Sequence, residues 1–458
     1  MTAGLNGTVW EPARRADETL TAPAIEPNGA VLPAAVLDLE LSEPLPGLPA
    51  IGADGRRVAQ AWMLVRLFSE PLGTLLVDVP ETGLPAAELA VAVEGELGPV
   101  LRPHLAALGL AALPTGGITP ATEPAFLARR REVLADAPPI TVIICTRERP
   151  GALARALDSV LAQVYPRFRV LVVDNAPATD ATAEVVRSAA RRGPVDYLVE
   201  RKGGLSFARN AAVASAPGEI LAWLDDDEVA DPHCLAEVAR ALADHPEADV
   251  VSGVIVPAEL ETSAQLWFEQ FGGHSKGRGF TPDVFGPHTA HRQSPLYPLP
   301  PFGTGANMTF RAGVIERIGG FDTALGAGTP AMGSEDTLAF TQVLVGGGTI
   351  VYQPSAVTHH YHRRDFEGLH KQMVGYGAGL TAAYTSLLLK RPGLLWPLLK
   401  LAPGALRDLT SKDSLRVSTL RDDFPRELLT ANRRGMLAGP RAYLKGRRAA
   451  RAKARSGR

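Results

Sequence analysis

Three consecutive aspartates follow directly after an apolar segment: Asp225, Asp226 and Asp227 come after residues 220–224. Clustered carboxylates repel one another, so their proximity costs free energy unless a cation is shared between them. Magnesium and manganese favour oxygen ligands and commonly complete their coordination shell with water and substrate phosphates. The cluster therefore indicates a divalent metal, Mn²⁺ or Mg²⁺, that would neutralise a phosphate-bearing leaving group. The alternative is a solvated acidic turn.

A second acidic pair, Glu335 and Asp336, comes just before a helix-like apolar pattern over residues 338–344. The helix dipole favours negative charge in the first turn of a helix, so simple capping is one interpretation. The other interpretation is catalytic, because a positioned carboxylate can remove the proton of a hydroxyl as that hydroxyl attacks carbon. We regard both residues as candidate catalytic groups.

Three histidines follow a strand-like segment at residues 350–352. On an extended chain His360 and His362 point to one side and His359 points to the other. One of them could serve as a further metal ligand. A zinc site is not favoured, because no cysteine is nearby and two histidines do not complete a tetrahedral set. The alternative is a polar strand end.

The elements that would position these residues are strands alternating with helices. Short β-branched apolar runs at residues 140–145, 170–173 and 220–224 predict buried strands. Apolar residues on one helical face between 153 and 164 predict a helix between the first two strands. Alternation of this kind predicts βαβ units and a mostly parallel sheet.

Ligands of such sheets bind outside the carboxyl ends of the strands. Thr146 and Arg147 follow the first predicted strand, and Asp174 ends the second. An aspartate in that place can accept a hydrogen bond from a ribose hydroxyl or a base N–H, although it could also be a turn residue. These residues are expected on the same edge of the sheet as Asp225.

The composition is that of a globular protein: 458 residues, 46% hydrophobic, 21% charged and a net charge of −2. With two cysteines, Cys145 and Cys234, a disulfide framework is not expected, and a reducing cytoplasm fits better. The sequence shows neither a signal-peptide pattern nor an apolar run long enough to span a membrane. A cytoplasmic location is therefore expected.

The C-terminal part differs in character from the rest of the chain. Residues 387–399 are apolar but interrupted by proline and charge, and no acidic residue follows Glu427. A basic segment can add roughly 1 kcal/mol per Lys or Arg near an anionic membrane surface. A peripheral position on the cytoplasmic face of a membrane is one interpretation, and a packed helix with a loose basic tail is the other. No nucleic-acid partner is expected.

Changes in composition and apolar pattern along the sequence predict five parts. Residues 1–35 are expected to be disordered, and 36–135 to form a small accessory domain of unknown role. Residues 136–380 are expected to form the catalytic domain, 381–432 a helical extension, and 433–458 a basic tail.

Six segments resemble, in order, the family 2 glycosyltransferases, which have a GT-A type fold. The resemblance covers about residues 139–380. The segments are 142–150 at the opening strand, 172–175 at the second strand, 204–210 with Ala-Arg-Asn, 224–227 with the Asp-x-Asp element, 303–307, and the Glu-Asp pair at 335–336.

The resemblance implies a role for each matching residue. The donor nucleotide would be bound by Thr146, Arg147, Arg149, Asp174, Arg209, Asp225 and Asp226. The metal would be bound by Asp227, Asp225 and His360, with His359 and His362 as alternatives to His360. Asp336 would be the base with Glu335 beside it, and Gly305 and Asn307 would lie near the sugar and the acceptor.

Processive members of the family carry Gln-x-x-Arg-Trp after the catalytic acid, whereas this sequence has Gln372 to Tyr376 there without Arg-Trp. We therefore predict an inverting enzyme that transfers one sugar from a UDP- or dTDP-sugar to a glycan or lipid-linked glycan in cell-envelope biosynthesis. The alternatives are a metal-dependent nucleotidyltransferase and a non-catalytic sugar-binding protein on a decayed transferase domain.

Overall fold

The structure is a computed structural model of the chain. It describes residues 24–25, 31–275, 278–287, 294, 296, 302–410, 420 and 424–456. Most of residues 1–35, for which disorder was predicted, lie outside the described residues. Within the described residues, β1 (Ala24–Ile25) pairs with β2 (Val31–Leu32). Among the described residues, none of the helices combines the length and the apolar character that crossing a membrane requires.

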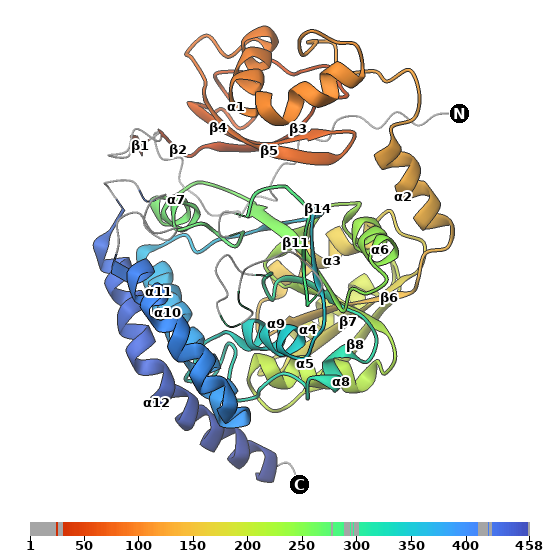
Figure 1. Ribbon diagram of the computed structural model, residues 1–458. Helices are drawn as coiled ribbons and strands as arrows, with labels where there is room; N and C mark the ends of the chain where they lie inside the picture. Colours follow the sequence, from red (N-terminus) through yellow and green to blue (C-terminus); the bar gives the residue numbers. More distant parts are fainter. Residues whose placement is uncertain are drawn as a thin grey trace.

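The N-terminal domain is a three-stranded sheet covered on one face by a long helix (Figure 1). Its elements are β3 (Ala35–Glu40), β4 (Gln60–Leu67), β5 (Glu70–Asp78) and α1 (Ala86–Ala107). Leu89, Val93, Leu97 and Leu101 recur every fourth residue, so they lie along one face of α1 and pack onto the apolar side chains of β4 and β5. The domain has a hydrophobic core of its own.

Helix α2 (Ala125–Ala135) leads into a domain built on a nine-stranded sheet. Its elements are β6 (Ile140–Thr146), α3 (Pro150–Leu161), β7 (Phe168–Asn175), α4 (Ala181–Ala189), β8 (Val195–Glu200), α5 (Leu205–Ser215), β9 (Ile220–Asp225), β10 (Glu228–Ala230), α6 (Cys234–Asp244), β11 (Val250–Pro257), α7 (Ser263–Gln270), β12 (Asp283–Phe285), β13 (Asn307–Phe310), α8 (Val314–Arg317), α9 (Glu335–Val345) and β14 (Ile350–His360).

The strand order is β10-β14-β11-β13-β9-β6-β7-β8, with β12 beside β14. Strands β9, β6, β7 and β8 are parallel, as the alternation of strands and helices predicts. The other half is mixed, because β10, β12 and β13 pair antiparallel with their neighbours. The sheet is thus less parallel than expected, since these short strands arrive without a crossover helix of the βαβ kind.

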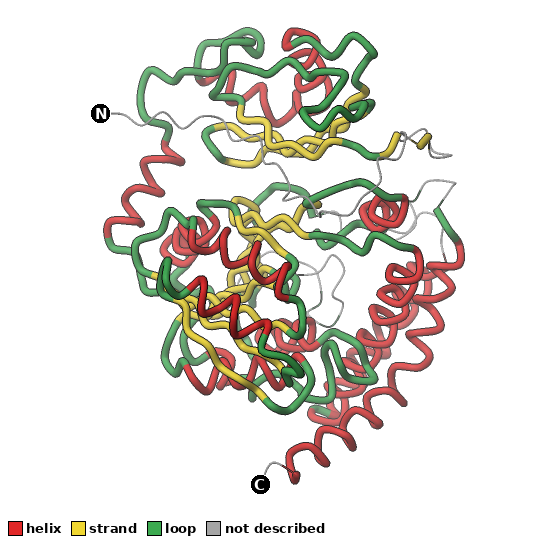
Figure 2. Tube along the Cα trace, turned by 180° about the vertical axis from the view of Figure 1, so that it is seen from behind, coloured by secondary structure: helices red, strands yellow, loops and turns green. Residues whose placement is uncertain are grey.

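Helices cover both faces of this sheet (Figure 2). Along β6, Val142 and Ile144 pack with α3, α4 and α6, whereas Ile143 between them packs with α5, α8 and α9. Burial on both faces explains why the strand is a continuous apolar run. The α/β class, with a central sheet flanked by helices, is confirmed.

The C-terminal region is helical: α10 (Phe366–Lys390), η1 (Pro392–Leu394), α11 (Leu395–Thr410) and α12 (Arg426–Ser456). Helices α10 and α12 lie side by side along one flank of the catalytic domain (Figures 1 and 2). Their backbones approach closely, since a Cβ on Gly435 would collide with the carbonyl oxygen of Val374. The boundaries expected at 380/381 and 432/433 both fall inside helices, so residues 433–456 continue α12 rather than form a loose tail.

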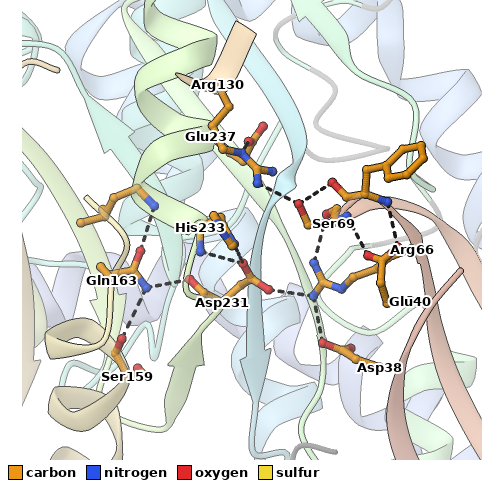
Figure 3. A network of polar contacts seen from close by, with 12 residues as sticks. Asp38, Glu40, Arg66, Ser69, Arg130, Ser159, Gln163, Asp231, His233 and Glu237 are labelled. Carbon is orange, nitrogen blue, oxygen red and sulfur yellow. Dashed lines mark hydrogen bonds and ion pairs between the residues drawn. The ribbon is translucent and has the colours of Figure 1, made fainter. Parts of the chain in front are cut away.

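The N-terminal domain contacts the catalytic domain through buried charged side chains (Figure 3). Arg66 on β4 extends Nη2 to Asp231 Oδ2 at 3.0 Å and to Asp38 Oδ2 at 3.1 Å. Arg130 on α2 pairs Nε with Glu237 Oε1 at 2.6 Å. Because Asp231 directly follows β10 and Glu237 lies on α6, the contacts reach both strand and helix of the catalytic sheet.

Candidate functional site

The three aspartates stand at the turn between β9 and β10. Asp226 and Asp227 are buried, and the side chain of Asp225 is 36% exposed. Arg149, just before α3, pairs with both buried carboxylates and reaches Asp227 Oδ2 at 2.8 Å. Thr146 Oγ1 donates a hydrogen bond to Asp226 Oδ2 at 2.6 Å. Thr146 and Arg149, both predicted to bind nucleotide, therefore hold the aspartate turn in place.

The charges of this turn are distributed unequally. Burial and the neighbouring charge of Asp227 raise the pKa of Asp226 to about 7. Burial also opposes ionisation of Asp227, but His360 and Arg149 outweigh it and hold the pKa of Asp227 below its ordinary value. Asp227 is consequently the carboxylate that stays charged at neutral pH.

His360 lies against Asp227, with 3.4 Å between His360 Nε2 and Asp227 Oδ1. The pairing of β14 with β10 places them together, because His360 is opposite Glu228 in the register. His359, the neighbouring residue, faces the N-terminal domain instead, where its Nε2 lies 3.6 Å from Asp38 Oδ1. Of the three histidines, His360 is the one that the strand geometry brings to the aspartates.

A chain of side chains orients the imidazole of His360. His362 Nε2 lies 2.8 Å from Glu269 Oε1, and His362 Nδ1 lies 3.0 Å from His360 Nδ1. A carboxylate can only accept, so we assign the His362 proton to Nε2, and the His360 proton then belongs on Nδ1. The other ring nitrogen of His360, Nε2, then lies beside Asp227. Burial lowers the pKa of His362, which favours its neutral form.

These residues fit a divalent metal chemically. One imidazole nitrogen and one carboxylate oxygen, 3.4 Å apart, are close enough to bind the same ion. His274, which follows α7, adds a third imidazole: the ligand atoms of His274, His360 and His362 all lie within 4.8 Å of one another. Glu269 and His274 were not predicted from the sequence, because neither belongs to a motif or follows a predicted strand.

Arg209 lies between the two acidic clusters. Its side chain is 2% exposed, with Nη1 3.0 Å from Glu335 Oε1 and Nη2 3.5 Å from Asp225 Oδ1. Nη2 also donates to the carbonyl oxygen of Gly305 at 2.9 Å. The guanidinium therefore holds the two acidic clusters together, and its predicted role in nucleotide binding stays a prediction.

Asp336 begins α9 and is held by backbone donors. Its Oδ2 accepts from the Gly305 N–H at 2.6 Å and its Oδ1 from the Thr337 N–H at 2.7 Å. A Cβ on Gly305 would lie 2.9 Å from Asp336 Oδ2, so a larger residue there would displace the Asp336 carboxylate. Glu335 beside it is buried, and burial raises the pKa of Glu335 to about 7, with Arg209 acting in the opposite direction. Asp336 is the member of the pair that is fixed and accessible.

Asn307, which was predicted to lie near the sugar and the acceptor, has its side chain buried in the sheet. The side chain is 5% exposed, and Nδ2 donates to the carbonyl oxygens of Ala356 at 2.8 Å and Val254 at 3.2 Å. Its amide therefore ties β13 to the irregular stretch between β11 and β14. The residue is structural, because a buried amide must satisfy its donors within the fold.

A cleft of about 1650 Å³ opens beside Asp336. Asp225, Arg209 and Asp336 line one wall. The opposite wall comes from the C-terminal helices, with Tyr376 on α10 and Leu398 on α11 among the lining residues. Helical character was predicted for residues 381–432, whereas their part in the cleft wall was not predicted from the sequence.

The remaining predicted nucleotide residues lie at the carboxyl ends of β6 and β7. Asp174 is buried and its Oδ2 accepts from the Tyr197 hydroxyl at 2.7 Å, while burial raises the pKa of Asp174. Arg147 is exposed at the same edge. Asn175 holds the adjoining loop, since Oδ1 accepts from the Gly204 N–H at 2.7 Å and Nδ2 donates to the Lys202 carbonyl oxygen at 3.0 Å.

Residues 141–319 match the sequence model of the family described as "Glycosyl transferase family 2". The matched segment extends from β6 to the residues just after α8 and includes the turn with the three aspartates.

Two curated proteins are similar over the same region. The glucosyl-dolichyl phosphate glucuronosyltransferase of Haloferax volcanii is 27% identical over 198 residues, which are 41% of this chain and 57% of that protein. The succinoglycan biosynthesis protein ExoM of Rhizobium meliloti is 29% identical over 228 residues, 48% of this chain and 66% of that protein. The chain thus spans less than two thirds of either relative.

Among solved structures, the mannosyltransferase PcManGT of Pyrobaculum calidifontis in complex with GDP-Man and Mn²⁺ shares 23% sequence identity. The similarity covers 73% of this chain and 83% of that chain, with a TM-score of 0.39.

Proposed function

We propose that the protein is an inverting, non-processive and metal-dependent glycosyltransferase that moves one sugar from a UDP- or dTDP-sugar to an acceptor hydroxyl. The observation that carries this proposal is the connection of the two acidic clusters at one cleft. Arg209 links Asp225 to Glu335, and the Gly305 N–H fixes Asp336 beside them. A donor held at the aspartate turn and an acceptor in the cleft would then meet at Asp336.

In the proposed reaction Asp336 removes the proton of the acceptor hydroxyl as that oxygen attacks the anomeric carbon from the side opposite the leaving diphosphate. The two backbone donors on its oxygens keep the carboxylate oriented. Asp227, Asp225 and His360 would hold the metal. That ion, when bound, supplies positive charge at the departing diphosphate.

The acceptor is proposed to be a glycan or a lipid-linked glycan of the cell envelope. Support comes from the relatives, whose names refer to a dolichyl phosphate substrate and to succinoglycan biosynthesis. Single transfer is supported by the cleft wall, where Gln372 Nε2 donates to the Tyr376 hydroxyl at 2.9 Å at the place where processive members carry Arg-Trp.

A peripheral membrane position is part of the proposal. The outward face of α12 carries only basic charges after Glu427 and includes Leu437, which is 87% exposed. On α11, Trp396 is 67% exposed. Such a surface suits anionic headgroups, and its attraction should weaken with salt. Sedimentation with phosphatidylglycerol vesicles but not with phosphatidylcholine vesicles is the expected result; equal recovery with both would contradict it.

The test of the enzymatic proposal is a transfer assay with a panel of nucleotide sugars and Mn²⁺. Asp336→Asn should lower turnover about 10²–10⁴-fold while leaving donor binding and folding intact. The control, Glu316→Gln on the distant helix α8, should behave like the wild type. If Asp336→Asn retained full turnover, Asp336 would not be the base.

A further inference from the structure

The last turn of α12 reaches the loop that adjoins the predicted nucleotide edge. One face of α12 is buried, and it includes Gly435, Gly439, Tyr443 and Gly446. The Tyr443 hydroxyl donates to Asp322 Oδ2 at 3.1 Å, and a Cβ on Gly446 would lie 2.6 Å from the Ala324 carbonyl oxygen. The helix thus continues past α10 onto the catalytic domain itself.

Lys453 extends this buried face. It is half-buried, whereas the other basic residues of α12 point outward: Arg433, Arg434, Arg441, Lys445, Arg447, Arg448, Arg451 and Arg455 are all exposed. Lys453 Nζ donates to the carbonyl oxygen of Gly203 at 2.5 Å and lies 5.9 Å from the centre of the Phe207 ring. One lysine of the basic helix is therefore directed at the catalytic domain.

Gly203 lies between two cations from distant parts of the chain. A Cβ on Gly203 would be 3.8 Å from Arg147 Nη1 and 4.0 Å from Lys453 Nζ. The loop that contains Gly203 is tied to the end of β7 by Asn175, beside Asp174. Both cations consequently stand at the carboxyl ends of β6 and β7, where a parallel sheet binds its ligand.

Two like charges at one position raise each other's energy, and an anion between them reverses that cost. A nucleoside diphosphate carries such charge and offers several acceptor oxygens. We propose that Lys453 and Arg147 together contact the donor nucleotide, so that the C-terminal helix completes a donor pocket begun by the catalytic sheet. This inference rests on the proposed function, because it takes the strand edge as the nucleotide site.

A purely structural role would use the same hydrogen bond. In that case Lys453 fastens α12 to the Gly203 carbonyl, and its loss loosens the helix without changing nucleotide affinity. Nucleotide affinity therefore separates the two roles, whereas thermal stability alone does not.

The experiment is calorimetric titration of the full chain with UDP, dTDP and GDP, each with Mn²⁺. Lys453→Met should weaken binding of the preferred nucleotide about tenfold or more, as expected for the loss of a charged hydrogen bond. The matched control Arg455→Met removes the same charge two residues later from an exposed position and should leave affinity within twofold. Lys453→Arg, which keeps the cation, should restore most of the affinity.

Each other result has a defined meaning. If the wild type binds a nucleotide and Lys453→Met binds it equally well, the inference is wrong and the proposed function stands. If the wild type binds none of the three, the proposed function fails and the inference with it. Should Lys453→Met not fold, Arg147→Met is the second variant, since Arg147 is exposed; unchanged affinity there overturns the proposal equally.

Discussion

The two regions that flank the catalytic domain are attached to it by opposite means. The N-terminal domain is attached through buried charges, with Arg66 on Asp231 and Arg130 on Glu237 (Figure 3). The C-terminal helices pack through small residues: Gly446 of α12 lies against the Ala324 carbonyl oxygen of the catalytic domain, and α10 and α12 touch each other at Gly435. A buried ion pair is weakened by the loss of one charge, whereas a close backbone contact is weakened by added volume.

This difference matches what each region does for the site. Asp231 lies four residues after Asp227, and Asp38 reaches His359, the neighbour of His360. The N-terminal domain thus contacts Asp231 and His359, which are near the proposed metal ligands Asp227 and His360 in the sequence. The C-terminal helices form a cleft wall and contact the Gly203 loop directly. One region acts by positioning strands, and the other supplies surfaces for ligands.

The largest expected effect is on the N-terminal attachment. Arg66→Ala leaves Asp231 and Asp38 without their cation and should lower the free energy of unfolding by about 3–5 kcal/mol. Chemical denaturation measures it, with Arg102→Ala on the exposed side of α1 as the control. Mn²⁺ affinity should fall as well. If the Arg66→Ala protein is as stable as the wild type and binds Mn²⁺ equally well, buried charges do not attach the N-terminal domain, and the contrast with the C-terminal helices is wrong.

The stability that the contacts of Asp38 contribute should depend on pH. Burial disfavours ionised Asp38, but Arg66 and His359 outweigh it and lower the pKa of Asp38 from 3.8 to about 2. A lowered pKa stabilises the folded state above pH 3.8, and that contribution disappears as the pH falls toward 2, at about 2–3 kcal/mol in total. Asp38→Asn should be less stable than the wild type at pH 6, and the difference should shrink below pH 3.8.

The C-terminal attachment should respond to size rather than charge. Gly435→Ala would force α10 and α12 apart and should cost about 1–3 kcal/mol. Gly404→Ala in α11, whose Cβ would meet open space, is the control and should be neutral or slightly stabilising. Denaturation compared at pH 6 and pH 3 should show the same loss for Gly435→Ala at both values, since no titrating group is involved.

The smallest effect on stability is expected inside the catalytic domain. Glu269→Ala removes the acceptor that fixes the His362 and His360 protons, which should weaken Mn²⁺ binding about 10–100-fold. Glu269→Gln retains an acceptor oxygen and should recover most of that affinity, and Glu261→Ala nearby should have no effect on it. If neither flanking region changes Mn²⁺ affinity but Glu269→Ala does, the catalytic domain assembles its metal site alone.

The sequence is sufficient to predict the parts of the site that follow periodic strands. Thr146, Asp174 and Asp225 end buried strands, so the apolar pattern alone predicts that they lie at one edge of the sheet. For Arg209 and Asn307, motif position alone predicts ligand roles. The structure adds buried hydrogen-bond partners for both side chains, and these depend on tertiary contacts that the local pattern does not encode.

At the C-terminal end of the chain, the charge pattern alone does not predict the structure. The density of basic residues after Glu427 suggests a loose tail, yet the buried stripe through Tyr443 and Gly446 makes the segment a helix. Most helical stability comes from packing one face, and here that face is made largely of glycine and alanine, which carry little hydrophobic signal. Glu269 and His274 escape prediction because their proximity to His360 arises only from the fold.

The neighbouring histidines of β14 also bear on how the strand finds its alignment during folding. Side chains alternate along a strand, so sliding β14 by one residue against β10 would exchange His359 and His360. In the shifted register His359 would face Asp227, and His360 would face Asp38. Contact with the N-terminal domain thus stabilises one register of β14 over the register that is shifted by one residue.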